Sequence, residues 1–160
     1  MNADDHVIFV YGTLRPGQPN YRVVSSGVAT QISAHGHGLR LYAASHRGYP
    51  YASLGPAHEA VVGSLLLLRP ARVHDTLRRL DHLEGFDPDH PDQGHYLRRH
   101  HTVVTDEPSR IGPTGTRIAA WVYLAGPRTP LACLHPIPSG DWMHPTTATE
   151  RTRACVACSV

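Results

Sequence analysis

Two short stretches of the chain are apolar on both faces, and they constrain the fold more than any other feature. Residues 6–12 are HVIFVYG and residues 59–68 are EAVVGSLLLL. Successive side chains of a strand point to opposite faces, so a strand without polar alternation is expected where both faces are covered. Neither stretch reaches the roughly 20 residues of a membrane-spanning helix. We therefore predict two buried central strands.

A change of period marks residues 72–83 as a helix. Val73, Leu77 and Leu80 lie at positions i, i+4 and i+7, which fall on one helical face, while charged residues occupy the other. Gly85 follows, and glycine commonly ends a helix.

The other segments predict strands and loops. Residues 96–105 and 116–126 favour a hairpin, because Pro and Gly interrupt the chain only between them. Residues 29–44 predict a pair of strands with glycine turns, and residues 46–56 predict a Pro/Gly loop. The prolines after Gly126 exclude a long regular element there.

The order of these elements predicts an α+β domain with a small mixed, mostly antiparallel barrel-like sheet and flanking helices. One core is expected, because 160 residues fit a single domain. We place this domain over residues 1–145 and expect a flexible C-terminal tail over residues 146–160. No long apolar surface helix demands a partner, so we expect a monomer or a weak dimer.

The composition argues against several classes of protein. The formal charge of +2 is too small for a nucleic-acid-binding protein. All 15 basic residues are Arg, so chemistry that needs a lysine amine is excluded, such as Schiff-base formation or a Walker-type phosphate loop. The N-terminal MNADDHVIFV lacks the basic region of a signal peptide. We expect a cytoplasmic protein that contacts neither nucleic acid nor membrane and needs no cofactor.

The cysteines predict neither a disulfide framework nor a zinc site. There are three, Cys133, Cys155 and Cys158, and the CVAC pair has no second pair to complete a tetrahedral zinc site.

The histidines leave a metal-dependent hydrolase open as a third hypothesis. His35 and His37, and then His100 and His101, could supply ligands, but neither pair has the i, i+4 helical spacing of zinc proteases. Adjacent residues of a strand face opposite sides, so His100 and His101 cannot enter one site without a bulge. We expect no metal.

Glu84 is a candidate general acid/base. It lies eleven residues after Val73, which places it within about 20° of Val73 on the helical wheel. Burial and the negative end of the helix dipole would both raise its pKa toward neutrality. Alternatively, the helix has already ended at Leu83 and Glu84 points into solvent.

The junction YGTL, residues 11–14, is a candidate anion-binding loop. A glycine after a strand is commonly only a turn. In the functional alternative, Gly12 lets the chain turn so that successive backbone N–H groups remain free to hold a carboxylate.

Together, these motifs resemble the gamma-glutamylcyclotransferase-like family over roughly residues 7–142. The segments that carry the resemblance are VYGTLRPGQPN at 10–20, GYPYA at 48–52, LDHLEGFD at 80–87, YLRR at 96–99, AWVYLAG at 120–126 and IPSGDW at 137–142. The family includes gamma-glutamylamine cyclotransferases, AIG2-like proteins and an enzyme that deprotects a gamma-glutamylated antibiotic intermediate. Ser64 departs from the pattern, because many relatives have Glu at this position.

The resemblance implies a barrel-like fold whose cavity binds a gamma-glutamyl group. Glu84 would be the catalytic acid/base of a reaction that releases an amine and forms 5-oxoproline. The loop of Tyr11, Gly12, Thr13 and Leu14 would hold the glutamyl moiety through backbone N–H groups.

Two further residues, Tyr96 and Tyr123, match tyrosines near the family's pocket. The leaving amine stays open, and an Arg-only composition favours a secondary metabolite. The alternative is a non-catalytic module that binds a gamma-glutamyl group or another carboxylate with the same fold.

Overall fold

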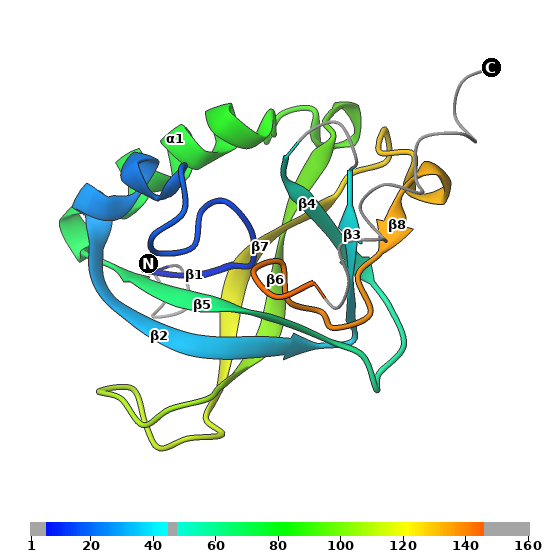
Figure 1. The fold of residues 1–160 in the computed structure, drawn as a ribbon. Helices are drawn as coiled ribbons and strands as arrows, with labels where there is room; N and C mark the ends of the chain where they lie inside the picture. The colour runs from blue at the N-terminus through cyan, green and yellow to red at the C-terminus, as the bar shows by residue number, and fades with distance from the viewer. Residues whose placement is uncertain (1–5, 45–47, 146–160) are drawn as a thin grey trace.

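The computed structural model describes residues 6–44 and 48–145, and its largest feature is a closed five-stranded barrel (Figure 1). The barrel strands, in the order in which they pair, are β1 (Val7–Val10), β5 (Ala60–Leu68), β2 (Val28–His37), β6 (Tyr96–Thr105) and β7 (Arg117–Ala125). Closure pairs β1 with β7 in parallel at Ile8 and Trp121, and the other barrel pairs are antiparallel. The predicted α+β class and mostly antiparallel barrel are confirmed.

A second sheet of three antiparallel strands lies beside the barrel (Figure 1). Its strands, in order, are β4 (Pro50–Leu54), β3 (Leu39–Ala43) and β8 (His135–Pro136). In the described ranges the α-helix is α1 (Val73–Glu84). The short 3₁₀ turns are η2 (Tyr21–Val23), η3 (Ser25–Gly27), η4 (Pro70–Arg72), η5 (Pro91–Gln93) and η6 (Leu131–Cys133).

The strands β1 and β5 are apolar on both faces because a hydrophobic cluster covers each face. One cluster fills the barrel and receives buried side chains from all five barrel strands, namely Phe9, Ile32, Leu65, Val103 and Val122 among others. Their neighbours Ile8 and Leu66 point outward, into a second cluster. Both predicted buried strands are therefore confirmed, with all four residues of β1 buried.

The helix α1 covers the outward face of the barrel. Val73 and Leu80 are buried in the outer cluster, and Leu77 packs against it. The helix ends one residue later than the sequence predicts, at Glu84, and Gly85 caps it in the left-handed conformation with φ 64°. The backbone N–H of the cap closes the last helical turn.

One segment that the sequence predicts as a loop contains a strand. The sequence predicts a loop over residues 46–56, yet Pro50–Leu54 forms β4. Proline is tolerated at the first residue of a strand and on edge strands, and Pro50 begins β4 at the edge of the second sheet. A Pro/Gly-rich sequence does not reveal this placement.

The two strands expected between residues 29 and 44 are present but do not pair with each other. A turn at Gly38, with φ 70°, separates them. β2 pairs with β5 and β6, whereas β3 pairs with β4 and β8. The chain thus passes from the barrel to the second sheet at Gly38.

The predicted hairpin over residues 96–126 is confirmed as β6 and β7, which pair from Tyr96 with Ala125 to Val104 with Arg117. After β7, the described part of the chain forms the short turn η6 and the two-residue strand β8 and no long element, as its prolines require. Among the described helices, none is long and apolar enough to cross a membrane. The predicted tail, residues 146–160, lies outside the described residues.

Candidate active site

A cavity of about 320 Å³ lies where the loop after β1, the start of β4 and the end of α1 meet β6 and β7. Every residue that the sequence singled out for substrate binding or catalysis lines it. These residues are Tyr11, Gly12, Thr13, Leu14, Glu84, Tyr96 and Tyr123. Segments far apart in sequence therefore converge on one site.

Glu84 is partly buried in the wall of this cavity. Burial raises the pKa of its carboxyl group to about 7. The alternative in which the helix ends at Leu83 and Glu84 faces solvent is wrong, because Glu84 belongs to the last turn of α1. A carboxyl group with this pKa is present in both protonation states near neutral pH, so it can accept and return a proton.

The loop after β1 presents unpaired backbone donors. Within the described residues, the N–H groups of Gly12, Thr13 and Leu14 donate no hydrogen bond. The loop is held instead by its carbonyls, since Arg15 N–H donates to Gly12 O and Asn20 N–H donates to Thr13 O, each at 3.0 Å. The Asn20 side-chain amide donates to Thr13 Oγ1 at 3.0 Å. Because all three residues line the cavity, their free N–H groups are candidate donors to an anion such as a carboxylate.

Gly12 is required for space rather than for its turn. The sequence suggested that glycine lets the chain turn here, but the φ of Gly12 is not positive. A Cβ atom at this position would lie 2.6 Å from Cγ of Pro50. The backbone can approach β4 this closely only without a side chain, so this part of the expectation is corrected.

The tyrosine hydroxyls at the site are already used within the protein. Tyr11 Oη donates to Tyr123 O at 2.6 Å and accepts from Ala52 N–H at 3.2 Å. Tyr96 Oη donates to Pro50 O at 2.8 Å. Burial, followed by the nearby Glu84 charge, raises the pKa of Tyr11, so its hydroxyl stays protonated. These tyrosines build the cavity wall and fix the loop and β4.

A network that the sequence analysis missed anchors the end of α1 to the barrel. Tyr123 Oη donates to Asp81 Oδ1 at 2.7 Å. The Arg98 guanidinium donates to both oxygens of Asp81 at 2.8 and 2.9 Å, and it also stacks 4.9 Å from the Trp121 ring centroid. Asp81 lies one helical turn before Glu84, so this network positions the carboxyl group. The i, i+3 spacing within LDHLEG was the available signal.

The cavity wall also contains several residues that the sequence does not single out. They are Phe9, Val10, Asn20, Tyr49, Pro50, Tyr51, His82, Leu83, Gly85 and His95. Tyr51 stacks on Tyr96, with ring centroids 4.6 Å apart. Among the described wall residues, Glu84 is the only Asp, Glu or Arg. The GYPYA segment was the signal for the aromatic part of this wall.

The histidines do not form a metal centre in the described residues. His35 and His37 lie on one face of β2, with their Nε2 atoms 3.0 Å apart, and His101 Nε2 lies 2.8 Å from His37 O. His100 stacks on Trp121 on the other side of β6. In the part of the chain that the structure describes, no group of three or more His, Cys, Asp or Glu side chains could hold a metal ion. The hydrolase hypothesis therefore gains no support, and Cys155 and Cys158 lie outside the described residues.

Solved structures from distant organisms share this fold. An AIG2-like protein from Mus musculus is 27% identical, with 79% of this chain and 80% of that chain covered and a TM-score of 0.59. YkqA from Bacillus subtilis is 21% identical with a TM-score of 0.58, and the match covers 87% of this chain but only 40% of YkqA. An uncharacterised protein from Pyrococcus horikoshii is 22% identical, with 85% and 88% covered and a TM-score of 0.50.

The sequence itself identifies the family. A comparison with curated proteins finds no match. The sequence profile of the family described as gamma-glutamyl cyclotransferase, AIG2-like, matches residues 8–144. This range includes the loop after β1, the end of α1 and the tyrosines of β6 and β7, so it spans the whole cavity described above. The chain belongs to the gamma-glutamyl cyclotransferase, AIG2-like family.

Proposed function

We propose that this protein is a cyclotransferase that releases an amine from a gamma-glutamyl amide and forms 5-oxoproline. The observation that carries the proposal is the placement of Glu84, whose pKa is raised to about 7, in the same cavity as three unpaired backbone N–H groups. A gamma-glutamyl group carries an α-carboxylate for the donors and an α-amine for the base.

The reaction needs no nucleophile from the protein. The substrate's α-amine attacks its own γ-carbonyl carbon, a new C–N bond closes a five-membered ring, and the original amide C–N bond breaks. Glu84, as a carboxylate, takes the proton that the α-amine loses and passes it to the leaving nitrogen, so the group returns to its starting state. The attacking nitrogen and the carbonyl carbon belong to one molecule. Holding that molecule folded lowers the activation barrier by several kcal/mol.

The loop after β1 would hold the α-carboxylate. Backbone N–H groups of Gly12, Thr13 and Leu14 are fixed donors, and fixed donors need little reorganisation when the substrate binds. Since the described cavity wall contains no Arg side chain, the proposed binding of the α-carboxylate depends on backbone N–H groups.

The charged residues of the cavity wall also favour a leaving amine that carries no carboxylate of its own. Such a carboxylate would face Glu84 and meet no Arg side chain in the described wall. Tyr49, Tyr51 and Tyr96 line the wall, and an aromatic wall suits a cationic or apolar amine. Simple gamma-glutamylamines and a gamma-glutamylated, amine-bearing antibiotic intermediate both fit, and we propose that the reaction takes place in the cytoplasm.

The proposal is tested by measuring 5-oxoproline release from a panel of gamma-glutamylamines, gamma-glutamyl amino acids and aminoglycoside conjugates. Glu84→Gln keeps the shape of the side chain but cannot take a proton, so kcat should fall about 10²-fold or more with little change in KM. Asp89→Asn removes an exposed carboxylate from the following loop and serves as the control, with expected wild-type rates.

Two outcomes would contradict the proposal. If Glu84→Gln turns over the panel as fast as the wild type, Glu84 is not the acid/base. If the wild type binds these compounds but releases no 5-oxoproline, the non-catalytic binding module is correct instead.

A further inference from the structure

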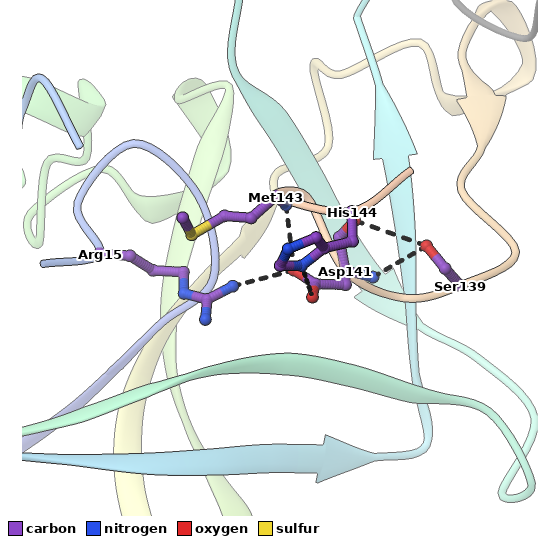
Figure 2. Close-up of polar contacts among 5 residues, drawn as sticks. All are labelled: Arg15, Ser139, Asp141, Met143 and His144. Carbon is purple, nitrogen blue, oxygen red and sulfur yellow. Dashed lines mark hydrogen bonds and ion pairs between the residues drawn. The ribbon is translucent and has the colours of Figure 1, made fainter. Parts of the chain in front are cut away.

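A mostly buried ion pair joins the substrate loop to the segment that follows β8. Arg15 Nη1 lies 2.9 Å from Asp141 Oδ1, across 126 residues of sequence. The exposed fractions of the two side chains are 15% and 17%, so the pair is shielded from solvent far more than an ordinary surface ion pair. Figure 2 shows Arg15 reaching from the loop after β1 toward the residues Ser139, Asp141, Met143 and His144.

Asp141 is also held in place by contacts that do not involve Arg15. Its Oδ1 accepts the Met143 N–H at 3.0 Å, its Oδ2 lies 2.9 Å from His144 Nδ1, and its own N–H donates to Ser139 Oγ at 3.3 Å (Figure 2). Burial alone would raise the pKa of Asp141, but hydrogen bonds from His144 and Met143 and the charge of Arg15 keep it below its usual value. The carboxylate is therefore charged and fixed.

The segment that carries Asp141 is itself anchored to both sheets. Ile137 N–H donates to Leu41 O in β3, and Val62 N–H in β5 donates to Gly140 O, each at 2.8 Å. Gly140 has a φ of 65°, and a Cβ atom there would lie 2.0 Å from Ala60 O, so the turn before Asp141 is pressed against β5. Asp141 thus follows a turn that is hydrogen-bonded to both sheets.

Arg15 depends on this contact. It directly follows Leu14, and its N–H closes the turn onto Gly12 O. Its Nε atom is buried without a hydrogen-bond partner in the described residues. The charge of its guanidinium is compensated by Asp141, to which Nη1 donates. Removing the acceptor leaves a buried, uncompensated cation, and the loop must move to expose it.

We infer that Arg15 and Asp141 are positioning residues that fix the loop of Gly12, Thr13 and Leu14 so that its backbone N–H groups converge on the substrate's carboxylate. Neither side chain lines the cavity, so they act through the loop. The kinetic part of this inference rests on the proposed function. The conformational part concerns the loop alone.

The kinetic test compares variants on a gamma-glutamylamine that the wild type turns over. Fixed donors bind the ground state and the transition state alike, so Asp141→Asn should raise KM about tenfold and change kcat less than about threefold. Arg15→Lys keeps the positive charge, so this variant should retain most of the wild-type affinity. The single variant Arg15→Met is measured as well. In Arg15→Met/Asp141→Asn no cation is left buried, so KM should rise less than the product of the rises in the two single variants.

The matched control is Glu59→Gln. Arg40 and Glu59 form another partly buried ion pair between segments, and neither residue lines the cavity. This variant should keep the wild-type KM. A role in general stability only would lower the yield of folded protein and leave KM unchanged in both variants.

Hydrogen exchange separates this inference from the proposed function. In Asp141→Asn, the amides of Arg15 and Asn20, which close the loop, should exchange at least about tenfold faster than in the wild type and in Glu59→Gln. If the wild type releases no 5-oxoproline, the proposed function fails, and the exchange rates still decide whether the pair holds the loop. Unchanged exchange at Arg15 and Asn20 in Asp141→Asn would overturn the inference.

Discussion

At the scale of the residue, Glu84 makes the stability of the protein depend on pH. The pKa of its carboxyl group is about 7 in the folded chain, against 4.5 for the unperturbed group. Between these values the folded chain keeps a proton that the unfolded chain has released, so the free energy of unfolding falls as the pH rises. Above pH 7 both states are ionised and the fall stops.

This predicts that Glu84→Gln is stabilised relative to the wild type at high pH only. The difference between the two proteins should change by about 3 kcal/mol between pH 4.5 and pH 8, because 2.5 pKa units correspond to that free energy. Urea unfolding at both pH values measures it. A difference that does not depend on pH would mean that the carboxyl group is not buried in the folded chain.

At the scale of the element, the end of α1 depends on the conformation of one residue. Gly85 has a φ of 64°, and nothing lies within 4 Å of a Cβ atom placed there. Gly85→Ala should therefore cost about 1 kcal/mol in the free energy of unfolding through backbone strain alone.

Asn tolerates this conformation better than Ala does, so Gly85→Asn should recover part of the loss. Because the cap also fixes the last helical turn, 5-oxoproline release should fall in Gly85→Ala. It should recover in Gly85→Asn together with the stability. Urea unfolding and turnover are measured on the same samples. Equal stabilities of the Ala and Asn variants would contradict the strain argument.

Elements that carry a signal in their own local sequence could be predicted. The two strands with both faces buried, the helix with its stripe and glycine cap, and the hairpin of β6 and β7 all carry local signals. β4 carries none, because its strand character depends on an edge position beside β3. The pairing of β2 with β5 rather than β3 likewise follows from the closure of the barrel.

The candidate site shows the same division. Glu84 and the YGTL loop could be placed from wheel geometry and the strand junction. The contacts that fix them could not, because the pair of Arg15 with Asp141 and that of Asp81 with Arg98 join residues 126 and 17 positions apart. Only the folded chain brings those partners together.

At the scale of the whole molecule, we propose that the chain is a monomer or a weak dimer. Within the described ranges the large apolar side chains with high exposure are Leu54, Leu83 and Met143, and Leu83 borders the cavity. Scattered single residues of this kind do not make an extensive apolar interface. Sedimentation velocity should give a mass near 17.5 kDa at micromolar concentration, and a stable larger species would contradict the proposal.

The parallel contact between β1 and β7 has a consequence for how the protein is made. The strand β1 is synthesised before β7, so the barrel cannot close between Ile8 and Trp121 until β7 has been made. Ile8 and Trp121 are 113 positions apart. At about 5–20 residues per second, β1 therefore lacks its β7 neighbour for about 6–23 s. Nascent chains arrested before residue 117 should therefore engage holdase chaperones, whereas release should follow once β7 has emerged.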